Sequence, residues 1–456
     1  MKLFFLTITF FSFHFLNAQT HEEVIQKIYE EQLNESPGYE NLRYLTKEIG
    51  NRLSGSPQAA AAVEYTRQLM ISYGFDTVFL QPTQVPHWVR GEKEVARILN
   101  SSTRGTFSLN PIALGNSIGT GKEGITAGLV EVASMEEVEE KGKALEGKIV
   151  FFNIPADNSL INTFQAYGGS VIQRVYGASE AAKYGAKAVI VRSATNMLDD
   201  IPHTGTLRYK PNIAQIPAVA ISTVEANSLS EILSREPQEL KVYLRTTCEM
   251  LGTSLSYNVV GQLNGTEFPD EYIAVGGHLD SWDVGEGAHD DGAGCVQGIE
   301  VLRAFKKLGL KPKRTLRAVM WMNEENGGAG GRTYADQAEE NGEKHIAAIE
   351  SDRGGFVPRG FTSTGTDSQQ EQLMSWGQKY FSRYQLHSFD QPGGGADIGP
   401  LAIQGTFLIG LFPDSQRYFE IHHTENDVFE KVNRRELELG AAAMTALVYL
   451  IDQEGI

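Results

Sequence analysis

The chain has 456 residues, of which 41% are hydrophobic and 21% charged, and its formal net charge at pH 7 is −17. This length exceeds what one hydrophobic core usually serves, so we expect two or three lobes, and the ordinary composition argues against disorder. The acidic balance disfavours nucleic acid and anionic membranes as partners. Cys248 and Cys295 are too few for a disulfide framework, and we expect two free, buried thiols.

Residues 1–18 (MKLFFLTITFFSFHFLNA) combine an early lysine, an apolar run rich in Phe and Leu, and a small residue before Gln19. This is the layout of a cleavable secretory signal, and the run is too short and too close to the terminus to favour a membrane span. No cysteine follows it, so a bacterial lipoprotein anchor is not supported. We therefore expect a protein exported to the periplasm or the exterior, without a membrane anchor.

Residues 19–113 predict the first part of an α/β peptidase domain. Ser56 and Pro57 form an N-cap and first-turn pair, the helical run continues to Tyr73, and Gly74 stands where a glycine ends a helix. Residues 75–80 (FDTVFL) then alternate like a strand. Such a strand needs a sheet to join, which must come from later in the chain.

Residues 114–250 have a different texture, with short β-branched strands and one amphipathic helix. His203 is the only histidine of this segment, and a single histidine is far more often structural than ligating. We therefore expect an inserted module without chemistry of its own. Through KYGAKAVIV (183–191) and IPAVAIS (216–222) it resembles the protease-associated domain, a β-rich insert of exported peptidases.

Residues 251–456 return to an α/β rhythm, in which strand candidates alternate with helical stretches. This alternation predicts a mainly parallel mixed sheet flanked by helices on both faces. The last helix is the clearest, since Asn433 and Glu436 form a capping box before an apolar stripe. The strand candidates are 257–263 (YNVVGQL), 272–277 (YIAVGG), 315–323 (TLRAVMWMN), 345–351 (HIAAIES) and 406–412 (TFLIGLF).

Histidine and carboxylate side chains follow several of these strands, at the edge where open α/β sheets place their ligands. Residues 275–294 (VGGHLDSWDVGEGAHDDGAG) hold two histidines and four aspartates among glycines, a density that indicates metal chemistry. Alone, a histidine or aspartate at a strand end more often binds the backbone than a metal, and the adjacent Glu324 and Glu325 are equally consistent with a solvated acidic turn. Together, the motifs point to one site. The side chains concerned are His278, Asp280, Asp290, Glu324, Glu325, Asp352, His422 and His423.

Five motifs in order, HLDS, DDGAG, NEENGG, ESD and HHTEND, resemble those of the M28 family of zinc peptidases, closest to its plasma glutamate carboxypeptidase subgroup. The resemblance covers nearly the whole mature chain. It implies a zinc aminopeptidase-like fold of the phosphorylase/hydrolase type, small peptide substrates and a homodimer.

The resemblance also implies two zinc ions per chain, bridged by Asp290. His278 and Asp352 would complete one ion, and Glu325 and His423 the other. Zinc accepts such neutral imidazole and carboxylate ligands and leaves positions open for water, although cobalt or manganese would accept them too.

Carried over in the same way, Glu324 becomes the general base and Asp280 the partner that fixes the tautomer of His278. The peptide bond between Asp290 and Asp291 is implied to be cis. Many family members have tyrosine just before the last histidine ligand, where it can donate to the oxyanion, whereas this chain has His422, whose role is therefore open.

Two further residues have open roles. His289, beside the expected bridging ligand, is either structural, which we favour, or a substrate contact. Asp397, in the glycine-rich segment 393–400 (GGGADIGP), either binds a substrate ammonium or caps a turn.

These observations together predict an exported di-zinc exopeptidase that hydrolyses dipeptides or removes N-terminal residues from short peptides. Within the fold, the alternatives are a carboxypeptidase acting on short or N-blocked peptides and a glutaminyl cyclase, which needs one zinc. A receptor-like ectodomain without catalysis is the alternative from another class.

Overall fold

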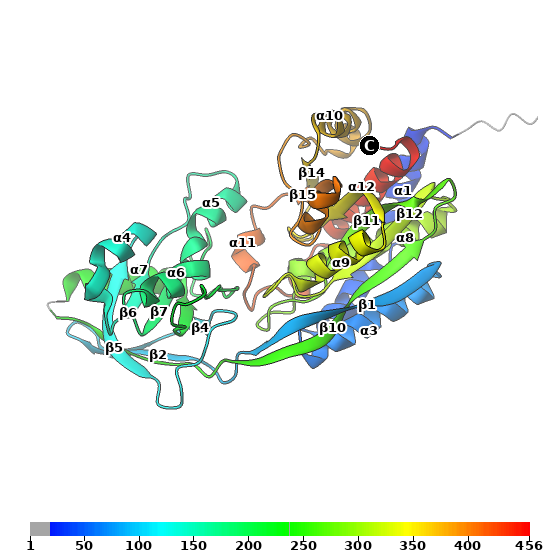
Figure 1. Ribbon diagram of the computed structural model, residues 1–456. Coiled ribbons are helices and arrows are strands. Elements are labelled where there is room, and N and C mark those ends of the chain that lie inside the picture. The colour runs from blue at the N-terminus through cyan, green and yellow to red at the C-terminus, as the bar shows by residue number, and fades with distance from the viewer. Residues whose placement is uncertain (1–18, 237) are drawn as a thin grey trace, which may run out of the picture.

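The computed structural model describes residues 19–236 and 238–456, which form two lobes, each built on its own sheet (Figure 1). The expected signal sequence, residues 1–18, lies outside the described residues. Among those described, no helix combines the length and the apolar character of a membrane span. Cys248 and Cys295 are both free and buried, as expected.

The larger lobe contains a seven-stranded mixed sheet. Its central strands β12, β11, β13 and β15 are parallel, whereas β10 and β14 run antiparallel to their neighbours, which confirms the mixed α/β class. In spatial order the strands are β1 (Thr77–Val89), β10 (Glu249–Leu263), β12 (Arg314–Trp321), β11 (Phe268–His278), β13 (Lys344–Glu350), β15 (Phe407–Pro413) and β14 (Pro358–Thr364).

Helices cover both faces of this sheet because its strands are apolar on both sides. In β12, Leu316, Ala318 and Met320 face one core, and Val319 and Trp321 face the other. The first core is closed by α1 (His21–Glu35), α3 (Pro57–Ser72), α8 (Ala293–Leu308), α10 (Asp367–Trp376) and α12 (Arg434–Glu454), and the second by α9 (Ala329–Glu340).

The helix-start signals at Ser56 and Asn433 are present, but the capping box predicted from Asn433 and Glu436 is incomplete, because the Glu436 side chain pairs with Arg417. The Ser56 side chain caps α3, with Pro57 in its first turn, and the Asn433 side chain accepts backbone N–H groups at the start of α12. The short helices α2 (Gly38–Arg43) and α11 (Tyr418–Ile421) complete the lobe.

The smaller lobe is an eight-stranded mixed sheet between two apolar cores. Its helices are α4 (Met135–Lys141), α5 (Thr163–Ser170), α6 (Ile172–Ala182) and α7 (Thr223–Arg235). In spatial order its strands are β3 (Gly105–Leu109), β2 (Val95–Ser101), β9 (Lys241–Arg245), β5 (Ile125–Val132), β6 (Ile149–Phe152), β7 (Ala188–Arg192), β8 (Ala218–Ile221) and β4 (Ile112–Ala113).

The smaller lobe begins earlier than residue 114, the boundary predicted from the sequence. Strands β2, β3 and β4 already belong to its sheet, and β2 pairs with β9 from Val95 opposite Arg245. The predicted boundary was misplaced because β2 belongs to the sheet of its hydrogen-bonding partner β9. That partner lies about 150 residues further along the chain, so the local sequence does not reveal it. The two lobes are connected by the long β1–β10 ladder, which pairs Thr77 with Gln262 at one end and Val89 with Glu249 at the other.

Candidate metal centre

The histidine and carboxylate side chains predicted from the sequence converge at the carboxyl edge of the parallel strands. His278 is the last residue of β11, Glu324 and Glu325 follow β12, and Asp352 follows β13. The chain beyond β15 passes through α11 and brings His423 to the same edge.

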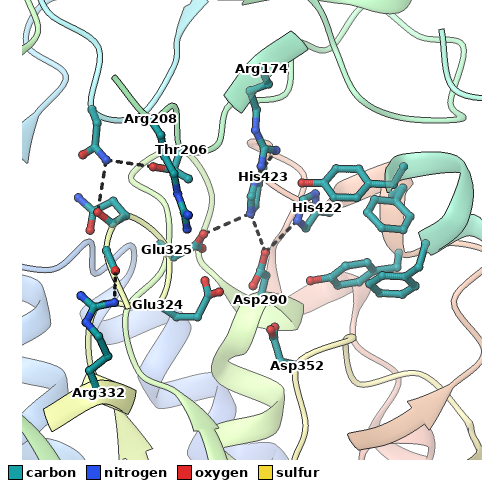
Figure 2. A pocket seen from close by; sticks show the side chains of 17 residues that line it. Arg174, Thr206, Arg208, Asp290, Glu324, Glu325, Arg332, Asp352, His422 and His423 are labelled. Carbon is teal, nitrogen blue, oxygen red and sulfur yellow. Dashed lines mark hydrogen bonds and ion pairs between the residues drawn. The ribbon is translucent and has the colours of Figure 1, made fainter. Parts of the chain in front are cut away.

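Asp290 lies between two groups of these side chains and faces each with a different oxygen. Figure 2 shows its contacts with His422 and His423. Its Oδ1 is 3.1 Å from His278 Nε2, which is itself 3.3 Å from Asp352 Oδ1. Its Oδ2 is 3.3 Å from His423 Nε2, which is 3.2 Å from Glu325 Oε2. Asp290 is thereby shared between two clusters of possible metal ligands, His278 with Asp352 and His422 with His423. Glu325 adjoins the second cluster through His423.

The loop that carries Asp290 is fixed by two other buried aspartates. The Asp427 carboxylate accepts the backbone N–H of His289 at 2.7 Å and that of Asp290 at 3.1 Å. The Asp291 carboxylate accepts the backbone N–H of His278 at 3.0 Å. The peptide bond between Asp290 and Asp291 is cis, as the family resemblance implied.

Asp280 contacts His278 through its main chain more closely than through its side chain. His278 Nδ1 lies 2.9 Å from the Asp280 carbonyl oxygen and 3.9 Å from Oδ1. A carbonyl can only accept, so Nδ1 carries the proton, which leaves the Nε2 lone pair free for a metal ion held together with the Asp290 and Asp352 carboxylates. The Asp280 carboxylate accepts the N–H groups of Asn323 at 2.6 Å and Glu324 at 3.0 Å, which fixes the turn after β12.

The electrostatics of the centre favour a bound cation. Burial, together with the charges of Asp352 and Asp290, raises the pKa of Glu324 to about 8, although His278 acts in the opposite direction. Burial, followed by the charge of Asp290, raises the pKa of Glu325 well above its usual range, and Glu325 Oε1 is buried without a hydrogen-bond partner. Carboxylates held so closely are costly unless positive charge compensates them, so these residues fit a divalent ion with histidine and carboxylate ligands.

His422 also enters the centre, with Nε2 at 3.6 Å from Asp290 Oδ2 and its ring stacked on that of His423 at a centroid distance of 3.5 Å. It takes the place of the tyrosine that many family members have at this position. His289 instead packs away from the centre, since its ring stacks on Phe356 and its Nδ1 accepts the N–H of Gly355 at 3.0 Å. These contacts give His289 a structural role and not that of a substrate contact.

Asp397 is 1% exposed and does not line the cavity in front of the centre. Its nearest acidic neighbour is Glu350, whose Oε2 accepts the backbone N–H of Asp397 at 3.0 Å. Burial, followed by the charge of Glu350, raises the pKa of the Asp397 carboxyl well above its usual range. The structure therefore does not present Asp397 to a substrate ammonium in this cavity.

A cavity of about 480 Å³ opens onto Asp290, Glu324 and His423. Both lobes line it. Because the insert rejoins the chain shortly before the metal-binding strand, the sequence places it near the mouth of the site, but it does not single out the lining side chains, since the smaller lobe contributes no metal-ligand residue types. No motif in the sequence distinguishes these side chains from other surface residues. The smaller lobe contributes Asn116, Phe164, Tyr167, Arg174, Thr206 and Arg208.

The smaller lobe also holds the segment between β15 and α12, which carries His422 and His423. Three threonines of that lobe form hydrogen bonds with this segment, two through their hydroxyl groups and one through its backbone N–H. The bonds connect Thr163 to Ser415, Thr195 to Phe419 and Thr204 to His423.

The carboxyl edge of this mixed α/β sheet holds two histidine–carboxylate groups around one shared aspartate. This combination of fold and site defines a metal-dependent hydrolase. Residues 258–448 match the model of Peptidase family M28. Carboxypeptidase Q from Bos taurus is 36% identical to this chain over 91% of the chain and 84% of its own length, and that from Homo sapiens is 34% identical over the same shares. The chain therefore belongs to peptidase family M28 and is a zinc metallopeptidase.

Solved structures agree with this assignment. The crystal structure of a Peptidase M28 precursor from Shewanella amazonensis SB2B covers 96% of this chain and 97% of its own, with 32% identity and a TM-score of 0.89. BSAP, a zinc aminopeptidase from Bacillus subtilis, shares the fold at 20% identity, with a TM-score of 0.65 over 91% of this chain and 95% of its own.

Proposed function

We propose that this M28 peptidase binds two zinc ions and hydrolyses dipeptides, or removes the N-terminal residue of short peptides. The observation that carries the proposal is the position of Asp290, whose two oxygens face different groups, His278 with Asp352 and His423 with Glu325. A carboxylate shared in this way would suit a two-ion centre, in which each group of residues would hold one ion.

Two zinc ions at this centre would supply Lewis acidity toward a peptide carbonyl and lower the pKa of a water molecule. Glu324 lines the cavity beside Asp290, and no described residue donates a hydrogen bond to its carboxylate. It is therefore available to take a proton from the attacking water and to pass it to the leaving amine. Glu324 and Asp352 also give a substrate α-ammonium an acidic environment.

Elemental analysis of the dialysed protein tests the two-ion centre, with close to two zinc ions per chain as the expected result. Substitution of Asp290 by Asn should remove most of both ions. A stoichiometry near one zinc ion per chain would contradict the proposal and would favour the glutaminyl cyclase, which needs one zinc. A dipeptide library assayed with and without chelator tests the reaction, which chelation should abolish.

A carboxypeptidase is the second candidate function, because the relatives at 34–36% identity bear the name carboxypeptidase Q. The two candidates differ in whether the substrate needs a free amino terminus. Hydrolysis of an N-acetylated dipeptide as fast as its free form would favour the carboxypeptidase.

We further propose that the protein is exported, that it forms a homodimer and that its smaller lobe is a protease-associated domain. The composition of residues 1–18 supports export, and the family resemblance supports the other two. N-terminal sequencing of secreted protein should begin at or near Gln19. Sedimentation velocity should give about twice the monomer mass.

A further inference from the structure

An arginine from the N-terminal part of the chain lies buried against the loop that leads to Asp290. Arg52 belongs to residues 50–56 (GNRLSGS), just before α3, and its side chain is fully buried in the larger lobe. Among residues 19–236 and 238–456, no carboxylate oxygen lies within 4.0 Å of its guanidinium group. A buried cation without an ion pair is costly, so the groups that do bind Arg52 indicate its role.

Within the described part of the chain, the guanidinium group donates only to backbone carbonyls, and all of them belong to one loop. Nε lies 2.6 Å from the carbonyl oxygen of Leu279, Nη1 2.8 Å from that of Glu286, and Nη2 2.8 Å from that of Gly287. The backbone N–H of Arg52 donates to Ser281 Oγ, in the same loop, at 3.1 Å. One side chain thus joins the two ends of the loop from Leu279 to Gly287.

Both ends of this loop adjoin expected metal ligands. Leu279 directly follows His278, the last residue of β11, and Gly287 precedes Asp290 by three residues. His278 Nε2 lies 3.1 Å from Asp290 Oδ1. The planar guanidinium group holds its donors in a rigid fork, so it fixes the spacing of the carbonyls that it binds, and with them the spacing of the two ligands.

The packing around Gly287 leaves this loop little freedom to take another path. Gly287 has a φ of +59°, and a Cβ there would clash with the Ser281 side chain and come within 2.9 Å of Arg52 Nη1. A Cβ at Gly292 would lie 2.8 Å from the Gly287 carbonyl oxygen and 3.3 Å from Arg52 Nη2. The guanidinium group and the loop therefore fit closely against each other.

Charge compensates the burial of Arg52 without a direct ion pair. Burial lowers the pKa of its guanidinium group, and the negative charges of neighbouring groups, among them Asp427, Asp291 and Asp280, act in the opposite direction. The Asp427 carboxylate accepts the backbone N–H of Asp290 at 3.1 Å. The approach to Asp290 is thus held by a cation at its carbonyl groups and by an anion at its N–H groups.

We propose that Arg52 is a positioning residue that sets the distance between His278 and Asp290, and thereby the zinc affinity of the centre. It acts through the backbone and does not line the cavity in front of the centre. This inference rests on the metal centre of the proposed function and deepens it. A lysine at this position would keep the charge, but it offers its donors from a single nitrogen and cannot span the same carbonyls.

The test measures the zinc affinity of the holoenzyme, by competition with a chromophoric chelator, for Arg52→Lys and Arg52→Met. Both variants should lose at least about tenfold in affinity, as the loss of groups that support metal ligands does. The cobalt-substituted Arg52→Lys protein should also differ from the wild type in its visible absorption, which reports the arrangement of ligands around the metal.

Arg317→Met is the matched control. Arg317 of β12 is also buried, with 6% exposure, but it pairs with Glu343 and not with the loop. Its substitution should lower the free energy of unfolding and leave the zinc affinity and the cobalt spectrum unchanged.

Wild-type zinc affinity in Arg52→Lys would overturn the inference, because the charge alone would then suffice. An equal loss of zinc affinity in Arg317→Met would also overturn it, since general destabilisation would explain both variants. If Arg52→Met does not fold, Arg52→Lys, which keeps the buried charge, decides alone. A zinc-bound wild type that hydrolyses no peptide, or that holds one ion, would contradict the proposed function and leave the comparison of affinities valid.

Discussion

The carboxylates of Asp290, Glu325 and Glu324 have different surroundings at the metal centre. The difference distinguishes the two proposed metal ligands from the proposed general base. Asp290 and Glu325 lie within 3.3 Å of histidine Nε2 atoms. Glu324 is half-buried, lines the cavity and is not paired with a histidine. Glu324→Gln should therefore keep both zinc ions and reduce kcat by at least about a hundredfold, the contribution expected of a general base. Metal analysis alongside a dipeptide assay measures both quantities.

The neighbouring substitution Glu325→Gln is the control for that prediction. It removes a ligand from the group that contains His423, so zinc content should fall toward one ion per chain together with activity. If Glu324→Gln were the variant that lost zinc, the roles of the two glutamates would be the reverse of those proposed.

At the scale of elements, the distance between α8 and β11 sets the position of the loop that carries Asp290. Gly298 of α8 lies against Gly276 of β11, and a Cβ at Gly298 would come within 2.7 Å of Gly276 Cα. Gly298→Ala should lower the free energy of unfolding by about 1–3 kcal/mol, as overpacking does, and should weaken zinc binding. Urea denaturation measures the first effect. Gly169→Ala is the control: this glycine of α5 has no atom within 4 Å of an added Cβ, and its substitution should be neutral or stabilising.

The elements that carry the metal ligands could be predicted from the sequence, because a buried strand followed by histidine or carboxylate is a local pattern. His278 after β11 and Glu325 after β12 are examples. The cavity wall could not be predicted. Arg208 and Asn116 lie on loops without periodicity, and they reach the site only because the smaller lobe folds back onto it. Asp397 is a different case, since the glycine-rich loop left two roles open, a substrate contact or a turn cap, and the side chain is buried beside Glu350 and away from the cavity.

At the scale of the whole molecule, the smaller lobe is part of the metal centre. Gly205 has a φ of +125°, and a Cβ there would clash with the Arg174 guanidinium and come within 2.6 Å of His423 Nδ1. Gly205→Ala should displace His423 and lower zinc content toward one ion, leaving the group of His278 and Asp352 intact. Gly252→Ala is a matched control, because this glycine has a φ of +103° and open space around it. Two ions retained in the Gly205 variant would show that the lobe does not support this ligand.

The same arrangement limits the length of the substrate. Arg208 and Phe164 of the smaller lobe line the same cavity as Glu324, so a peptide chain that extends beyond its first residues meets the smaller lobe. The carboxylates of Glu324 and Asp352 favour a free α-ammonium, and binding that charge in a partly dry site contributes enough to exclude blocked peptides by about a hundredfold or more. Relative to a free dipeptide, we expect kcat/KM to fall by at least that factor for the N-acetylated dipeptide, and strongly for a ten-residue peptide. Equal values for the longer peptide would mean that the lobe opens away from the site, and equal values for the acetylated dipeptide would mean that the amino terminus is not recognised.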